Sequence, residues 1–296
     1  MTPIVHGQQR PGPGETILTA VVLLVCCAAV VVPFVGIIAT SLSTADHINR
    51  AGGTFVLWPD GVSLDAYRAV LSGGVVLRAL LVSIGVTLVG TALSVVVSAM
   101  LAYALSRPGS FGHRPMLLLV LFSLLFSPGL IPLYLTVKEV GLINSYWSLI
   151  LPGVVSAFNV IVLRAFFMNI PSEVIESARI DGAGDFGIFT RIVLPLSRAV
   201  LAVIGLFYAV GYWNAFFNAL IYLQDQTKWP LTLVMRTYVL QNAQFAQGEL
   251  GASDVLAPQP ALQMAILVIA ILPILVVYPF LQRHFTAGML TGAVKG

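Results

Sequence analysis

Six stretches of this chain contain no charged residue, and each is long enough to cross a lipid bilayer. They cover residues 16–45, 79–106, 115–137, 140–163, 199–224 and 255–282. A spanning helix needs about 20 predominantly apolar residues, and one charge at its centre costs about 2.5–3.5 kcal/mol on insertion. We therefore predict an all-α integral membrane protein with six transmembrane helices. The expected spans are 17–40, 79–104, 116–137, 143–166, 198–223 and 261–282.

Composition supports the membrane class. Hydrophobic residues make up 58% of the chain and charged residues 9%, whereas soluble proteins carry about 25% charged residues. The net charge of +3 is dispersed, so nothing indicates a nucleic-acid partner. Cys26 and Cys27 are adjacent in an apolar run, which suits a membrane helix better than a disulfide. The first apolar stretch is longer than the 7–15 apolar residues of a signal peptide, so we expect a retained helix.

The distribution of Lys and Arg predicts the orientation. An even number of spans places both termini on one side of the membrane. If that side is the cytoplasm, it receives nine of the 15 Lys and Arg residues, and the short loop 107–114 holds two arginines and no acid. We therefore expect cytoplasmic tails at 1–15 and 291–296, with 46–78 and 225–254 outside.

A charge-rich run at residues 171–195 interrupts the apolar chain. Pro171 is a helix-start signal, and residues 173–181 suit a short amphipathic helix. Gly182 and Gly184 end that helix, and a second short helix is expected before the run closes. The pattern predicts a helix-turn-helix at the membrane surface. Residues 182–187 also fit G-x-G-x-x-G, but a dinucleotide site needs a preceding strand and here a helical pattern precedes, so we reject it.

This run resembles the EAA loop of ABC-importer permeases, in which Glu and two small residues are followed by Gly and then by Ile-x-Leu-Pro. In that family the loop forms the coupling helix, which sits in a cleft of the ATP-hydrolysing subunit. Ser177 is the one departure from the pattern, and it is still small. The resemblance implies that the ATPase-coupling residues are Glu176, Ser177, Ala178, Asp181, Gly182, Ile192, Leu194 and Pro195.

Further stretches are similar to the carbohydrate subgroup of these permeases. Before the second span the chain has Pro59 followed by Ser63-Leu64-x-x-Tyr67, and we expect a capped surface helix that packs through Leu64, Tyr67 and Leu71. Trp213-Asn214, followed by Lys228-Trp229-Pro230-Leu231, resembles the small-subunit permeases of oligosaccharide importers, in particular those that handle pectin- and alginate-type fragments.

The fifth span is the most polar and supplies most of the candidate substrate-pathway residues. Asn214 and Asn218 are four residues apart and share one helix face, as do Tyr208 and Tyr212. Aromatic rings and neutral amides suit a sugar, which offers C–H faces and hydroxyls. The alternative is that these residues join helices or anchor them at the interface. The candidate set is Asn159, Tyr208, Tyr212, Trp213, Asn214 and Asn218.

The sequence carries no signal for catalysis. The four histidines have no metal-ligand spacing, no P-loop occurs, and no cofactor or metal is expected. Energy must therefore come from another polypeptide. The absence of ionisable residues from the charge-free stretches argues against a secondary transporter.

The resemblance implies a permease domain over residues 16–290 in the inner membrane, which translocates a carbohydrate, expected to be an oligosaccharide. The implied partners are a second, non-identical permease, a dimer of ATP-binding subunits, an extracytoplasmic solute-binding protein and membrane lipid. The alternatives are a permease for a polyamine or phosphonate and a membrane scaffold without transport.

Overall fold

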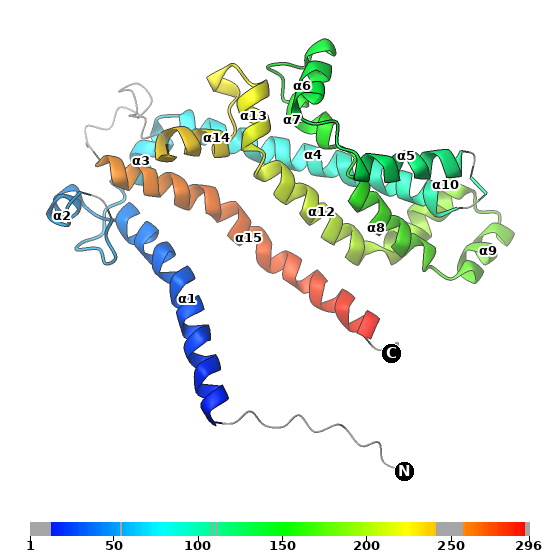
Figure 1. Ribbon diagram of the computed structural model, residues 1–296, viewed down its shortest axis with the longest axis horizontal. Helices are drawn as coiled ribbons and strands as arrows, with labels where there is room; N and C mark the ends of the chain where they lie inside the picture. Colours follow the sequence, from blue (N-terminus) through cyan, green and yellow to red (C-terminus); the bar gives the residue numbers. More distant parts are fainter. Residues whose placement is uncertain (1–12, 54, 108, 111, 241–256, 294–296) are drawn as a thin grey trace. The chain divides into compact units, whose positions relative to one another are not determined.

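The structure is a computed structural model that describes residues 13–53, 55–107, 109–110, 112–240 and 257–293. All regular elements in these ranges are helical, which confirms the all-α prediction (Figure 1). The chain divides into two compact units. The first contains residues 1–72 and 251–268, and the second contains residues 73–250 and 269–296.

The first unit begins with a long apolar helix over the first predicted span. Most side chains along this helix are exposed, as expected for a helix that faces lipid. The helices of this unit are α1 (Pro13–Ser41), α2 (Ala45–Arg50), α3 (Asp65–Ser72) and the beginning of α15 (Gln259–Ala293), which continues into the second unit.

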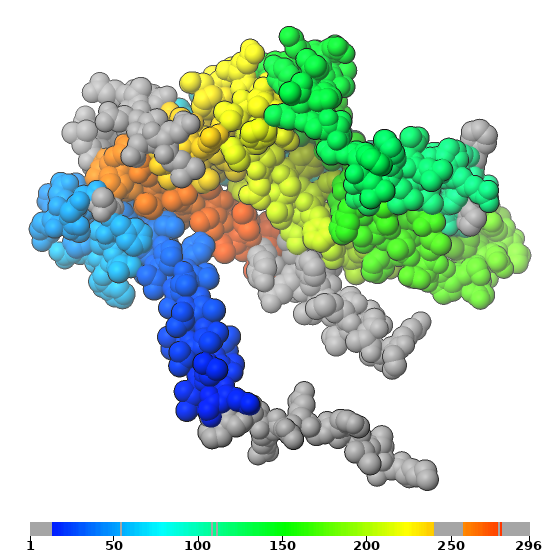
Figure 2. All heavy atoms as spheres, in the orientation of Figure 1, coloured from blue at the N-terminus to red at the C-terminus, as the bar shows by residue number. Residues whose placement is uncertain are grey.

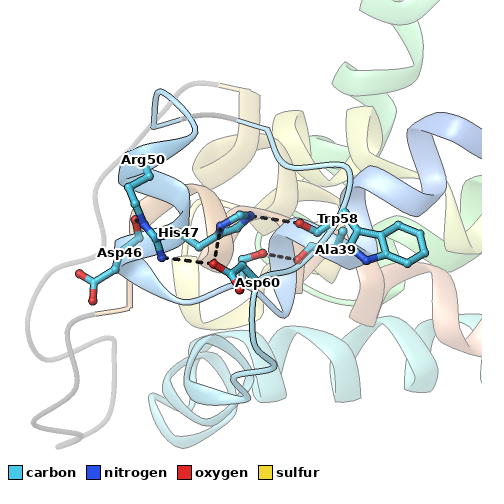
Figure 3. Close-up of polar contacts among 7 residues, drawn as sticks. Ala39, Asp46, His47, Arg50, Trp58 and Asp60 are labelled. Atoms are coloured by element: carbon cyan, nitrogen blue, oxygen red, sulfur yellow. Dashed lines mark hydrogen bonds and ion pairs between the residues drawn. The ribbon is translucent and has the colours of Figure 1, made fainter.

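Polar contacts hold the segment between α2 and α3 against α2 (Figure 3). His47 Nε2 lies 3.1 Å from the Trp58 carbonyl oxygen, and its Nδ1 lies 3.8 Å from the Asp60 carboxylate. Arg50 pairs with the same carboxylate at 3.4 Å. The Arg50–Asp60 ion pair is exposed and contributes little to stability, and the effect of these contacts is to fix the path of the loop.

The surface helix predicted near Ser63 is present as α3, but it packs differently. The Ser63 Oγ accepts the Asp65 N–H at 3.1 Å, at the first residue of the helix. The buried side chains are small ones from another face of the helix, among them Ala66 and Val70, whereas Leu64 and Leu71 are exposed. Our prediction that Leu64 and Leu71 pack inward was wrong because small residues allow a closer approach of the helix than leucine would.

The second unit is built on α4, which packs mainly against α12 and α8 (Figure 1). Its core side chains include Val160, Leu163 and Ile204, all fully buried. The elements are α4 (Val75–Ser106), α5 (His113–Leu125), α6 (Leu130–Glu139), α7 (Trp147–Ile150), the 3-10 turn η1 (Leu151–Gly153), α8 (Ala157–Met168), α9 (Ser172–Ile180), α10 (Asp185–Ile188), the π-helical turn η2 (Phe189–Val193), α11 (Leu194–Leu196), α12 (Arg198–Trp213), α13 (Phe216–Tyr222), the 3-10 turn η3 (Gln226–Lys228), α14 (Leu231–Met235) and the π-helical turn η4 (Arg236–Leu240).

Three predicted spans are interrupted instead of continuous. The third breaks between α5 and α6 around Pro128, because the residue before a proline is disfavoured in helical geometry. Pro132 lies in the first turn of α6, where a missing N–H costs nothing. The fourth bends by 49° between the segments 147–153 and 157–168, and the fifth breaks between α12 and α13.

By length and composition, three helices in the described residues can cross a membrane, and up to five spans result if each bent pair counts as one. The helix α5 is apolar but has only 13 residues, about 20 Å. Six spans therefore stay a prediction for this chain.

Candidate functional site

The charge-rich run 171–195 begins with the predicted amphipathic helix, now α9. Pro171 precedes it with a φ of −53° and lies at the N-cap position. Ile175 is buried, and Ala178 packs against the core of the second unit. Glu176 and Ser177 are exposed. The helix thus attaches to the bundle through one apolar face and presents a polar face outward.

The turn after α9 is set by Gly182. The Gly182 N–H donates to the Arg179 carbonyl at 3.0 Å, and the Ala183 N–H donates to the Ala178 carbonyl at 2.9 Å. This pair of bonds is a Schellman motif, which requires a left-handed residue at its turn. Gly182 has a φ of +84°, and it follows the end of the helix as the sequence predicts. Asp181, the residue before it, is exposed.

The second half of the run returns to the bundle through α10, η2 and α11. Ile188, Phe189 and Val193 are buried, whereas the predicted coupling residues Ile192, Leu194 and Pro195 are half-buried. The π-helical turn ends two residues before Pro195, whose missing N–H removes one regular helical hydrogen bond. The predicted second short helix is therefore present, with a wider turn inside it.

The run is tied to the end of α4 by Tyr103. The Tyr103 hydroxyl donates to the Asp185 carbonyl at 3.3 Å, and its ring lies 5.0 Å from the ring of Phe189. Arg107 donates to the same hydroxyl at 3.0 Å and stacks over the Tyr103 ring at 4.8 Å. The sequence placed Tyr103 and Arg107 at the end of a span, but it did not indicate this contact with the loop.

Two large apolar side chains stand exposed on either side of the Gly182 turn. Ile180 is 87% exposed and Phe186 is 74% exposed. The turn between them is closed by an ion pair of 3.1 Å between Arg179 and Asp185. In Figure 2 the segment from α9 to α10 forms part of the molecular surface at one end of the second unit. We did not predict these two residues, although large apolar residues within a charged run were a usable signal.

The candidate pathway residue Tyr212 lies inside the packing of α12 against α4. Its hydroxyl is 2.8 Å from Ser94 Oγ and donates to the Ile150 carbonyl at 3.0 Å. The Tyr212 ring lies over Gly90, where a Cβ would be only 2.8 Å from it. The absence of a side chain at Gly90 is thus what allows the ring to fit.

Tyr208, one turn earlier, is buried in the same way. Its hydroxyl is 2.6 Å from Ser98 Oγ and accepts the Ser156 N–H at 2.9 Å. The two tyrosines therefore join α12 to α4, to α7 and to the N-cap residue of α8 through hydroxyl hydrogen bonds. This is the geometry of the helix-joining alternative raised from the sequence.

The other candidate pathway residues differ in exposure. Asn159 in α8 and Trp213 at the end of α12 are buried. Asn214 is exposed, and its amide donates to the Val210 carbonyl at 2.9 Å, which closes the end of α12. Asn218 is half-buried in α13. The helix break thus separates the two asparagines that we expected on one continuous face.

No group of three or more His, Cys, Asp or Glu side chains within the described residues could hold a metal ion.

The family described as "Binding-protein-dependent transport system inner membrane component" matches residues 94–291, which include the loop and both helices that flank it. The chain belongs to this family. The permease is accordingly an inner-membrane component of a transport system that works with a binding protein, and its role is membrane transport, not catalysis.

Similar proteins cover nearly the whole permease. "Polygalacturonan/rhamnogalacturonan transport system permease protein YtcP" of Bacillus subtilis is 46% identical over 93% of this chain and 96% of its own length. "Arabinooligosaccharides transport system permease protein AraQ" of Halalkalibacterium halodurans is 29% identical over 90% of this chain and 91% of its own. A solved structure titled "Crystal structure of a bacterial ABC transporter involved in the import of the acidic polysaccharide alginate" matches with a TM-score of 0.85 and 26% identity, over 94% of this chain and 100% of that one.

Proposed function

We propose that this permease is one of two non-identical membrane subunits of an ABC importer for an oligosaccharide. The relatives support this substrate class, because their names refer to polygalacturonan, rhamnogalacturonan and arabinooligosaccharides. A dimer of ATP-binding subunits supplies the energy, and an extracytoplasmic binding protein delivers the sugar. Both termini lie in the cytoplasm, on the same side as the run 171–195.

The exposed tip of the run carries the proposal. Ile180 and Phe186 insert into a cleft of the ATPase as apolar anchors, while Glu176, Ser177 and Asp181 make polar contacts around them. Interfaces with measurable affinity have this composition, with a few buried anchors inside a polar rim. A soluble loop without a partner would expose two such side chains at a cost of about 1.5–3 kcal/mol each in lost burial.

Movement of the ATPase then reaches the bundle by two routes. One is the contact of Asp185 and Phe189 with Tyr103 at the end of α4. The other is covalent, because the run continues into α12 through a bend of 83°. The Schellman motif fixes α9 relative to α10, so that the run moves as a lever. ATP binding then shifts the population between inward-open and outward-open states.

Asn214 and Asn218 are our preferred pathway residues among the six candidates. The break at Asn214 exposes its amide, and interrupted helices commonly line substrate sites in membrane transporters. Tyr208, Tyr212 and Trp213 then hold the wall of the pathway from behind. Asn159 lies in the same wall on α8.

The test is a pull-down of the permease by tagged ATPase, combined with uptake of labelled oligosaccharide into proteoliposomes that hold the complete importer. Phe186→Ser removes one apolar anchor and should lower ATPase recovery by about tenfold or more. It should leave the membrane level of the permease unchanged, because this side chain is 74% exposed.

Leu196→Ser is the matched control, because Leu196 is also exposed, at 62%, but lies beyond the loop tip. Full ATPase recovery and full uptake by the Phe186→Ser protein would contradict the docking proposal. A wild-type importer that takes up another solute and no oligosaccharide would contradict the substrate class.

A further inference from the structure

Arg78 occupies an unfavourable position for a cation. Its N–H donates to the Gly74 carbonyl at 3.0 Å, which places it in the first turn of α4. A helix N-terminus carries positive partial charge, so a cation there destabilises the helix. The guanidinium is exposed and takes part in none of the ion pairs found among the described residues. Helix stability therefore does not explain an arginine at this position.

Arg78 lines a cavity of about 210 Å³ that lies wholly within the second unit. The other walls supply two aromatic side chains, Trp229 and Tyr238, the Gln226 amide and the Thr227 hydroxyl. The Trp229 indole N–H donates to a backbone carbonyl at 3.4 Å, which holds the ring in place. The cavity thus combines one cation, flat apolar surface and neutral hydrogen-bonding groups.

Arg78 also lines a second, more open groove of about 470 Å³. Tyr146 and Trp147 stand in this groove and are partly exposed, at 39% and 48%. The remaining wall is an apolar face of α4. The two hollows share Arg78, so an extended ligand held at the guanidinium could continue from one into the other.

The local charge balance is positive. The Asp225 carboxylate interacts electrostatically with Lys228 and Arg78, and its Oδ1 accepts the Thr227 N–H at 2.9 Å and the Thr227 Oγ1–H at 2.7 Å. These bonds, with smaller contributions from Lys228 and Arg78, hold the pKa of the Asp225 carboxyl below its usual value. One fixed carboxylate therefore faces two cations, and Lys228 already donates to the Asn144 carbonyl at 2.7 Å. Arg78 is the cation left to bind an anionic ligand.

We propose that the Arg78 cavity is a subsite for an acidic sugar residue, in which the guanidinium binds the sugar carboxylate and Trp229 packs against the pyranose ring. This inference rests on the proposed function as an oligosaccharide permease. The guanidinium fork matches a carboxylate with two parallel hydrogen bonds, and an aromatic face covers the C–H face of a sugar. Gln226 and Thr227 then bond to ring hydroxyls.

The size of the cavity limits its occupant. Pockets for drug-sized ligands measure about 300–1,000 Å³, so about 210 Å³ suits one sugar ring. The next rings of the chain lie in the open groove beside Trp147. A phosphate or an acidic side chain would satisfy Arg78 alone and would leave the aromatic and amide walls unused.

The test measures occupancy directly on the complete importer in nanodiscs. The reporter is Val75→Cys, at a residue that lines the cavity without a proposed contact to the sugar, in a Cys26→Ala, Cys27→Ala background, labelled with a maleimide. A galacturonate trimer should protect the thiol, while its methyl ester, which keeps the rings and loses the charge, should not. Arg78→Gln should raise the concentration for half-protection about tenfold, and Arg78→Lys should raise it less because the charge remains. Arg68→Gln is the control, since Arg68 is exposed, lies outside the cavity and pairs with Asp65 at 3.8 Å.

Other outcomes overturn the proposal. Equal protection by the acid and the ester would show that the sugar carboxylate does not contribute to binding at Arg78. Protection by the sugar-free binding protein alone would make Arg78 a docking contact for that protein. Uptake of labelled oligosaccharide without any protection would refute the subsite and leave the proposed function standing. Neither uptake nor protection in the wild type would refute both.

Discussion

The loop 171–195 and the seam between α4 and α12 have opposite chemistry within one compact unit. The loop exposes its large apolar side chains, Ile180 and Phe186, at a turn that faces away from the bundle. The seam buries hydroxyl groups, with Tyr208 and Tyr212 bonded to serines of α4. An apolar residue outside and a polar residue inside both reverse the usual rule for soluble proteins.

We attribute the difference to what covers each region, which is another helix of this chain at the seam and, as proposed above, the ATPase at the loop. In lipid, association of helices gains little from burying apolar surface, so hydrogen bonds and close approach at small residues join α4 to α12. In water, an exposed apolar pair gains most from covering by another protein. The seam is therefore satisfied by helices of this chain, while we propose that the loop is complementary to a second polypeptide. The predictions below test this contrast.

The largest effect is expected at the seam, for Gly90→Val. A Cβ at this position would lie 2.8 Å from the Tyr212 ring, so α4 and α12 must separate or the ring must move. Overpacking of this kind costs about 1–3 kcal/mol, and the new methyl groups add to it. We expect a strong fall in the amount of permease that survives detergent extraction and heating.

The control for Gly90→Val is Gly211→Val on α12, where a Cβ would meet nothing within 4 Å. Equal losses for both variants would mean that helix propensity, and not the contact with Tyr212, decides the stability of the seam.

The loop should respond to Gly182→Val with lost function and intact folding. The space around Gly182 is open, so the effect comes from the φ of +84°, where a β-branched residue is strained by about 1–3 kcal/mol. We expect a normal membrane level, weak association with the ATPase and a loss of uptake of tenfold or more. Pull-down and uptake are measured on the same preparation.

Gly187→Val tests whether the backbone of Gly182 is the cause. Gly187 lies in α10 and its Cβ would also meet nothing within 4 Å, but its φ is ordinary. Full uptake by the Gly182→Val protein would contradict the proposed coupling role of the loop. If Gly187→Val is equally harmful, the positive φ of Gly182 is not the cause.

The smallest effect is expected for Tyr212→Phe, which keeps the ring and removes the hydroxyl. Interhelical hydrogen bonds in membranes contribute about 0.6 kcal/mol on average, with a maximum of about 1.7. We expect a slightly lower midpoint of thermal unfolding for the purified complex and near-normal uptake. Combining the change with Ser94→Ala should be less than additive, because both remove the same bond. A loss of uptake at unchanged stability would instead place this hydroxyl in the substrate pathway.

The loop was largely predictable from the sequence because its structure is local. Pro171 marked the start of α9 and Gly182 marked its end, where the structure has a left-handed turn. The contact of Tyr103 with Asp185 was not predictable, because it joins residues 82 positions apart. The exposure of Ile180 and Phe186 was missed because the amphipathic pattern alone does not say which apolar residues lie on the turn.

The bundle was predictable only in outline. The third span breaks at a proline, Pro128, but nothing comparable in the sequence marks the break at Asn214, where the side chain closes the helix by bonding to Val210. Leu64 and Leu71 were assigned to a packing face that small residues occupy instead. The spacing of apolar residues indicates a helix, but the segments that pack against the helix decide which of its faces is buried.

The sequence by itself determined the membrane class and the shape of the loop. Each charge-free stretch avoids the cost of about 2.5–3.5 kcal/mol that a central charge adds on membrane insertion, and it does so independently of the other stretches. The Schellman motif is also local, because its hydrogen bonds join residues no more than five positions apart. Only the tertiary structure decided that Tyr208 and Tyr212 face α4 and that Arg78 and Trp229 line one cavity. Those arrangements depend on which helices meet, as in the bond between Ser94 and Tyr212, 118 positions apart in the chain.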